Sequence, residues 1–237
     1  MWNKKKVSVV FPAYNEEKGI GKAIREFFSV KFVDEIIVVD NNSKDKTAEI
    51  VKKTKAKLIQ ENKQGYGYAL IRGLKEATGD YVITAEPDGT FLAKDIHKLL
   101  LYSDDFDVVF GTRTSKSLIW DNAKMDWFLR MGNVFIAKIL EYLFNGPSLT
   151  DVGCTMKLIK KGVYQKIKNK FTVGGSHFSP EFMLLIIKNK IRCVEVPINY
   201  KERIGYSKIT NTFWKSLKLG LIMIHFIISY RLGFKGK

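Results

Sequence analysis

The alternation of strand-like and helix-like segments in the first hundred residues constrains the fold of this chain most. Short β-branched runs such as "VSVVFPA" (7–13) and "EIIVVD" (35–40) alternate with segments whose apolar residues recur at helical spacing, as in 17–30. Further strand patterns lie at 57–60 and 81–85, and further helical patterns at 48–54, 65–79 and 95–102. Repeated βα units of this kind predict a mostly parallel α/β sheet flanked by helices.

The second half of the chain is less regular but continues the same architecture. Strand patterns are expected at 107–113, at the end of 145–159 and at 191–200, where Pro197 indicates an edge strand or a bulge. Helical patterns cover 120–144 and 180–190, and 201–210 reads as a polar loop. Because neither an internal repeat nor a clear linker interrupts the pattern, we expect one domain with a C-terminal extension.

Charge favours an anionic partner without identifying it. The 237 residues include 40 Lys and Arg against 24 Asp and Glu, a formal net charge of +16. A nucleic-acid-binding protein would need aromatic residues interleaved with basic ones on one face, and "GYGYALIRG" (65–73) is a modest candidate, so nucleic acid is not the expected partner. The scattered Cys154 and Cys193 predict reduced thiols in the cytosol, and no zinc site is expected.

Three polar clusters each follow a predicted strand: "PAYNEE" (12–17), "DNNSKD" (40–45) and "EPDGT" (86–90). Ligands of parallel α/β sheets bind beyond the carboxyl ends of the strands, so the clusters are expected to line one crevice. Glu86 and Asp88 would repel each other unless a cation lay between them, and carboxylate oxygens suit Mg²⁺ or Mn²⁺. The alternative is a plain turn in which Asp88 and Gly89 reverse the chain.

An ordered series of motifs resembles the family 2 glycosyltransferases of the GT-A fold, particularly the polyprenyl-phosphate (dolichyl-phosphate) mannosyl- and glucosyltransferases. The series comprises "VSVVFPAYNEE", "EIIVVDNNSKDKT", "KQGYGYALIRGLKEATGDYVI", "EPDGTF", "FGTR", "LRMGN", "LTDVGCTMKLI", "SPEFM" and "EVPINYKERIGYSK". The resemblance implies a GT-A domain over 1–212, with a nucleotide-sugar half (1–110) and an acceptor half (111–212), followed by a C-terminal helix within 213–237.

The resemblance also implies a donor site for a GDP- or UDP-sugar. Glu86 and Asp88 stand where the family carries its Asp-x-Asp metal motif, so Glu86 is a departure that puts the choice between Mg²⁺ and Mn²⁺ in question. Thr90 stands where many relatives have glutamine. The residues expected to bind the nucleotide sugar are Pro12, Ala13, Tyr14, Glu16, Asp40, Asn42, Gly67, Glu86 and Asp88.

On the acceptor side, the resemblance implies a basic site for the phosphate of a polyprenyl or dolichyl phosphate. Asp151 matches the aspartate of the family's D-x-T-x-x-F-R segment, and Lys157 stands at its arginine position, where bidentate geometry is lost. The expected phosphate ligands are Arg113, Arg130, Lys157, Arg203 and Lys208, and the expected catalytic residues are Asp88, Arg113, Asp151 and Lys208.

The implied reaction inverts the anomeric carbon as a nucleoside diphosphate leaves, with the metal and basic residues stabilising the charge that develops on the leaving group. A lipid phosphate is already ionised near pH 7 and needs no base, whereas a hydroxyl acceptor on a glycan, lipid or small molecule would need a carboxylate such as Asp151 or Glu181. A sugar nucleotidyltransferase is disfavoured, because it should open with a glycine-rich G-x-G-x-R loop instead of "PAYNEE".

The C-terminal region predicts attachment to a membrane surface. "LGLIMIHFIISY" (219–230) lacks formal charge but is shorter than the roughly 20 apolar residues of a spanning helix. Residues 201–237 contain eight Lys and Arg and one acid, and basic and aromatic residues flank the apolar run, as in helices that lie in the interface. We therefore expect a peripheral protein on the cytosolic membrane face. A core helix or a homo-oligomer interface is the alternative, and the oligomeric state stays open.

Overall fold

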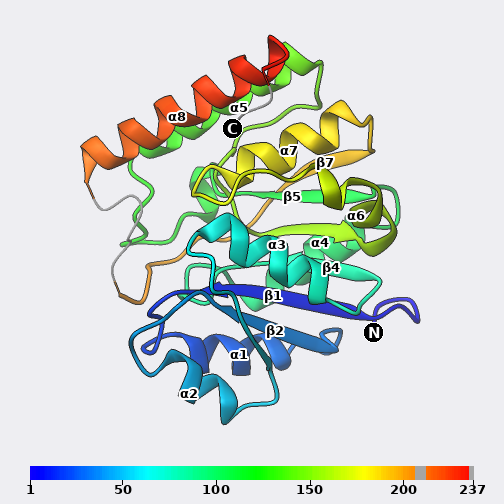
Figure 1. The fold of residues 1–237 in the computed structure, drawn as a ribbon, viewed down its shortest axis with the longest axis vertical. Coiled ribbons are helices and arrows are strands. Elements are labelled where there is room, and N and C mark those ends of the chain that lie inside the picture. Colours follow the sequence, from blue (N-terminus) through cyan, green and yellow to red (C-terminus); the bar gives the residue numbers. More distant parts are fainter. Residues whose placement is uncertain (206–211, 235–237) are drawn as a thin grey trace.

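The computed structural model describes residues 1–205 and 212–234, and these form a seven-stranded sheet between two layers of helices (Figure 1). The strand order is β3-β2-β1-β4-β6-β5-β7, and within the described chain β6 alone runs against its neighbours. The prediction of a mostly parallel α/β sheet is confirmed. The strands are β1 Val7–Ala13, β2 Glu35–Asp40, β3 Lys57–Gln60, β4 Tyr81–Thr84, β5 Val108–Thr112, β6 Lys157–Lys160 and β7 Cys193–Pro197.

The two faces of the sheet are covered by different helices, because successive side chains of a strand point to opposite faces. In β1, Val7, Val9 and Phe11 belong to a core shared with α1, α2 and α4, while Val10 belongs to a second core shared with α3, α6 and α7. The helices are α1 Ile20–Phe28, α2 Thr47–Lys52, α3 Tyr66–Glu76, α4 Ile96–Tyr102, α5 Trp127–Phe144, α6 Lys161–Ile167, α7 Phe178–Lys188 and α8 Phe213–Arg231, with short 3₁₀ turns at Ala93–Asp95, Lys116–Leu118 and Lys168–Lys170.

Several element boundaries differ from the sequence-based ones. The helix expected over 17–30 is α1, Ile20–Phe28, and the helix expected over 120–144 begins only at Trp127. The later start of α5 follows from Asp126, whose side chain caps the helix by accepting a hydrogen bond from Leu129 N at 2.8 Å. Pro197 lies in β7, at the edge of the sheet, as its missing N–H requires.

The C-terminal helix α8 runs alongside α5, above α7 and the β7 edge of the sheet (Figure 1). The two helices are parallel, because Phe128 contacts Phe213 near their starts and Phe144 lies near Tyr230 at their ends. Among the described residues, α8 is the one helix that is long and apolar enough to cross a membrane, judged by length and composition alone. Its most apolar 18-residue stretch has a mean hydropathy of 1.2, and 17% of that stretch is buried. The uncharged run of 219–230 is thus part of a longer helix.

Candidate active site

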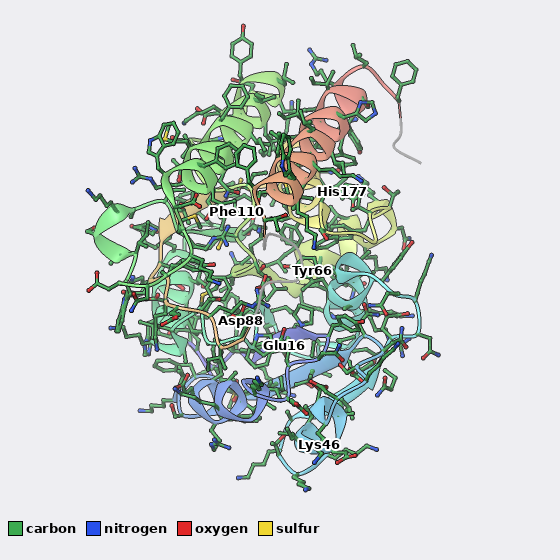
Figure 2. All side chains as sticks on the ribbon, turned by 90° about the vertical axis from the view of Figure 1, so that its left-hand side faces the viewer. Glu16, Lys46, Tyr66, Asp88, Phe110 and His177 are labelled. Carbon is green, nitrogen blue, oxygen red and sulfur yellow. The ribbon has the colours of Figure 1, made fainter. Side chains whose placement is uncertain are left out.

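The three polar clusters meet at the carboxyl edge of the parallel strands, as expected. Ala13 and Asp40 pair at the ends of β1 and β2, and the loops that follow are tied together by hydrogen bonds such as Asn15 N to Ser43 Oγ (2.9 Å) and Glu16 N to Thr47 Oγ1 (2.8 Å). Figure 2 looks onto this edge, with Glu16, Asp88 and Tyr66 near its centre, below the ribbons of α5 and α8.

A cavity of about 180 Å³ opens between these loops, and five of the residues expected to bind the nucleotide sugar line it. Asp40, Asn42, Gly67 and Asp88 are not among its lining residues. Asp40 instead accepts hydrogen bonds from Gln60 Nε2 (2.9 Å) and Ser43 N (3.1 Å). The lining residues are Pro12, Ala13, Tyr14, Glu16, Asn41, Gln64, Tyr66, Ala69, Glu86, Pro87, Ser176 and Arg203.

Gly67 shapes this cavity by allowing a close approach between α3 and the loop that precedes α7. Its backbone N donates to Gly174 O at 2.9 Å, and a Cβ at this position would lie 2.3 Å from Val173 O. Any larger residue would push the two segments apart. Glycine is therefore required at position 67 for packing, and the neighbouring Tyr66, not Gly67, lines the cavity.

Glu86 and Asp88 are each held by a threonine. Asp88 Oδ1 accepts hydrogen bonds from Thr90 N (3.0 Å) and Thr90 Oγ1 (2.6 Å), and Glu86 Oε1 accepts one from Thr155 Oγ1 (2.6 Å). Thr155 in turn is hydrogen bonded to the hydroxyl of Tyr66. One oxygen of each carboxylate is therefore fixed, and Asp88 Oδ2 and Glu86 Oε2 remain for another partner.

That partner in this structure is Arg203. Its Nη1 lies 3.0 Å from Asp88 Oδ2 and 3.7 Å from Glu86 Oε2, and its Nη2 lies 3.3 Å from Glu16 Oε1. The contact with Asp88 is an ion pair without hydrogen-bond geometry, so Asp88 Oδ2 is buried with no directed donor among the described residues. Burial, and then the charge of Asp88, raise the pKa of Glu86 to about 7.

The two carboxylates fit a divalent metal ion. Their remaining oxygens converge on one point, and the undirected contact at Asp88 Oδ2 leaves that atom able to accept a cation. Among the described residues no three His, Cys, Asp or Glu side chains gather around one point, so protein ligands beyond these two are not evident. Mg²⁺ commonly uses one or two carboxylates together with substrate phosphates.

A second cavity, of about 370 Å³, begins at Glu86 and extends between α5 and α8. Glu86, Arg113 and Arg203 line its polar end, whereas its apolar wall is formed by Met125, Phe128, Leu129, Phe135, Ile136, Leu217, Leu219, Leu221, Met223 and Ile224. Four residues, Tyr66, Glu86, Ser176 and Arg203, line both cavities. The two cavities therefore share a wall at Glu86 and Arg203, and the buried Asp88 lies behind it, in contact with Arg203.

Arg113 and Asp151 form a buried bidentate ion pair. Arg113 Nε and Nη2 donate to Asp151 Oδ2 (2.8 Å) and Oδ1 (2.9 Å), and the carboxylate also accepts from Arg113 N and Gly153 N. Although burial alone would raise it, the charge and hydrogen bonds of Arg113 lower the pKa of Asp151. The arrangement favours a positioning role for Asp151 over that of a base.

The other expected residues lie further from the cavities. Lys157 is buried, where its Nζ donates to Ser179 Oγ (2.7 Å) and to Cys154 O, and burial lowers its pKa to about 8. Arg130, in the first turn of α5, is half-buried and is not among the residues that line either cavity in the described chain. Glu181 accepts from Thr172 N (2.7 Å) and Val173 N (3.0 Å) and braces that loop. Lys208 lies outside the described residues.

Sequence reasoning missed Asn41, Tyr66, Thr155 and Ser176. Asn41 Nδ2 donates to Glu61 O (2.9 Å) and Lys63 O (2.8 Å), and its Oδ1 accepts from Gly65 N (2.7 Å), so it fixes the loop that leads into α3. Tyr66 stands in the "GYGY" run, an aromatic signal at the start of a helix beside the site. Thr155 reaches Glu86 across 69 positions of sequence, a distance that no local pattern reveals.

Comparisons with known proteins agree with this geometry. The family model "Glycosyl transferase family 2" matches residues 8–168. The chain is 28% identical to a dolichyl-phosphate hexose transferase of Haloferax volcanii, over 86% of each chain. It is also 28% identical to a UDP-N-acetylglucosamine–dolichyl-phosphate N-acetylglucosaminyltransferase of Methanococcus voltae, over 96% of this chain and 95% of that one.

The fold is similar to that of glucosyl-3-phosphoglycerate synthase from Mycobacterium tuberculosis, solved in complex with Mn²⁺, UDP and glucosyl-3-phosphoglycerate. The TM-score is 0.71 at 16% identity, over 99% of this chain and 82% of that one. At this identity the likeness concerns the fold, which agrees with the GT-A fold expected from the sequence.

Proposed function

Since the chain belongs to glycosyltransferase family 2, we propose that it moves a hexose from a nucleotide sugar to a polyprenyl phosphate, inverting the anomeric carbon with the help of a divalent metal ion. Two relatives carry dolichyl phosphate in their names, and the structural neighbour binds Mn²⁺ and UDP. These names support the classes of acceptor, donor and cofactor.

The observation that carries the choice of acceptor is the amphiphilic second cavity. Its polar end holds Arg113 and Arg203 beside the carboxylates, and its remaining length is walled by apolar side chains of α5 and α8. A phosphate joined to an isoprenoid chain matches this distribution of charge and apolar surface. A free sugar or a soluble glycan would leave the apolar wall without a partner.

The two carboxylates that could act as a base already have other partners, which also favours a phosphate acceptor. A hydroxyl acceptor needs a base, and both candidates have other partners: Asp151 is paired with Arg113, and Glu181 braces residues 172 and 173. A lipid phosphate brings an oxygen that is already ionised near pH 7. The geometry therefore gives no specific support to the hydroxyl alternative.

In the proposed mechanism, Pro12, Ala13, Tyr14 and Glu16 contact the nucleotide. Glu86 and Asp88 would hold a divalent metal ion, which would supply positive charge to the diphosphate leaving group. Arg113, fixed by Asp151, holds the acceptor phosphate at the polar end of the second cavity. The phosphate oxygen then forms a bond to the anomeric carbon while the bond to the nucleoside diphosphate breaks on the opposite side.

A membrane-facing surface on α5 and α8 is consistent with a lipid acceptor. The exposed apolar side chains include Trp127 (70% exposed), Tyr142 (88%) and Trp214 (74%), and the exposed Lys215 and Lys218 follow Trp214 in the first two turns of α8. Aromatic and basic residues around an apolar face suit a helix lying in the interface of an anionic membrane. We propose that the protein lies peripherally on the cytosolic face of the membrane.

The function is tested by incubating the purified protein with Mn²⁺ or Mg²⁺, a short polyprenyl phosphate in detergent, and a panel of labelled nucleotide sugars. One labelled lipid product is expected, and its donor identifies the base and the sugar. The matching polyprenol without phosphate should give no product. Transfer to the polyprenol, or equal transfer by a folded Asp88→Asn variant, would contradict the proposed acceptor or the metal assignment respectively.

A further inference from the structure

A short strap, defined here as residues 199–205, crosses the carboxylate site. Ile204 N donates to Asp88 O at 2.7 Å and Lys201 N donates to Thr90 O at 2.9 Å, so the strap is bonded to the backbone on both sides of Gly89. At its start, the side chain of Asn199 is held by Asp95 at 3.0 Å. These bonds fix the backbone from which the Arg203 side chain enters the site.

The guanidinium of Arg203 faces the two oxygens that a metal ion would need. The other oxygen of each carboxylate is already held by Thr90 or Thr155, and Arg203 Nη1 lies at 3.0 Å and 3.7 Å from the two that remain. Metal–oxygen distances are about 2.0–2.1 Å for Mg²⁺, so an ion bound to both oxygens would lie close to a like-charged nitrogen. Arg203 in its present position and a bound metal ion would therefore repel each other.

We propose that Arg203 is the resident cation of the metal site: it competes with the divalent ion for Asp88 and Glu86, and it yields only when a donor diphosphate arrives with the metal to receive the displaced guanidinium. The inference rests on the proposed function for the identity of the donor. Its physical basis is electrostatic, because two carboxylates prefer a double positive charge, whereas a diphosphate offers the guanidinium the charge-assisted hydrogen bonds that its contact with Asp88 lacks.

The same movement would couple the two cavities. Arg203 lines both of them, and the preceding strap residue Tyr200 places its ring 5.2 Å from the guanidinium carbon of Arg113. Displacing the Arg203 side chain moves a positive charge in the lining of both cavities, including the one whose polar end holds Arg113, the arginine assigned to the acceptor phosphate. Arg203 therefore determines the order of binding, with metal and donor entering together before the acceptor.

The test measures Mn²⁺ binding from the electron paramagnetic resonance signal of free Mn²⁺, without acceptor. Without nucleotide, Arg203→Met should bind Mn²⁺ about tenfold more tightly than the unmodified protein, because a like charge has left the site. With UDP or GDP present, whichever raises the affinity of the unmodified protein more, this advantage should disappear. Arg203→Lys, which keeps the charge, should resemble the unmodified protein.

Arg192→Met removes the same charge from an exposed position at the start of β7 and serves as the matched control. Circular dichroism checks that each variant is folded. Unchanged or weaker Mn²⁺ binding by Arg203→Met without nucleotide would overturn the proposal, as would Mn²⁺ binding that the Arg192 variant changes equally. Because this measurement involves no transfer, failure of the polyprenyl-phosphate assay would refute the proposed acceptor and leave this result standing.

Discussion

Replacing Thr90 by valine should weaken metal binding without disturbing the fold. The Thr90 hydroxyl donates to Asp88 Oδ1 at 2.6 Å, and the side chain is almost fully buried, so valine of the same shape removes one hydrogen bond and little else. The backbone N–H of residue 90 still donates to the same oxygen at 3.0 Å. In the variant, Asp88 Oδ1 would therefore accept one hydrogen bond from residue 90 instead of two.

The size of the effect follows from the charge on the acceptor. A hydrogen bond to a charged group contributes about 1.5–3 kcal/mol, and part of this orients the carboxylate for the metal. Since about 1.4 kcal/mol corresponds to tenfold in affinity, the expected loss of Mn²⁺ affinity is roughly 10- to 100-fold, the range found when outer partners of metal ligands are removed.

Isothermal titration calorimetry with Mn²⁺ in the presence of a saturating nucleoside diphosphate measures this loss. Thr54→Val is the matched control, because its hydroxyl donates to Val51 O at 2.7 Å at the end of α2, far from the carboxylates in the sequence. Equal affinity in the Thr90 variant and the unmodified protein would refute the idea that this hydroxyl prepares Asp88 for a metal ion.

Three other predictions concern buried groups. Asp151→Asn should lower the free energy of unfolding by about 3–5 kcal/mol, since it leaves the charge of Arg113 unpaired; a loss below about 1 kcal/mol in urea titration would contradict this. Burial lowers the pKa of Lys157 from 10.5 to about 8, so between these pH values the unfolded chain binds more protons than the folded one. The free energy of unfolding, compared with that of Lys157→Met, should therefore rise with pH in this range, by up to about 1.4 kcal/mol per pH unit. Urea titrations at several pH values measure this rise. Gly73→Ala should lower the free energy of unfolding by about 1–3 kcal/mol or more, because the new Cβ would lie 2.2 Å from Val10 Cγ1. A melting temperature equal to that of the unmodified protein would exclude this overlap.

The parallel part of the sheet and its polar edge were predictable from the sequence because their signals are local. The runs at 7–13, 35–40 and 81–84 are strands, and the polar residues that follow them meet as expected. The pairing of Glu86 with Asp88 was also read directly from their spacing.

Contacts between distant segments could not be read in this way. Lys157 looked like a phosphate ligand by its position in a motif, yet β6 directs it into the interior, against Ser179. Arg203 was expected to bind the acceptor phosphate, but its pairing with Glu16, Glu86 and Asp88 depends on the strap crossing the site. Periodicity records which face of an element is buried, and it carries no information about which distant side chain lies opposite.

The reversed strand β6 ties the chemistry of the site to the register of the sheet. Because β6 runs against β4, with Lys157 paired to Thr84, the residues just before β6 arrive at the edge where β4 ends, and Thr155 reaches Glu86. A slip of one residue in this pairing would turn Thr155 away from Glu86 and carry buried side chains to the opposite face. Insertions or deletions between 150 and 160 should therefore be tolerated far less than their loop-like sequence suggests, since a change in length there would also move the threonine that holds Glu86.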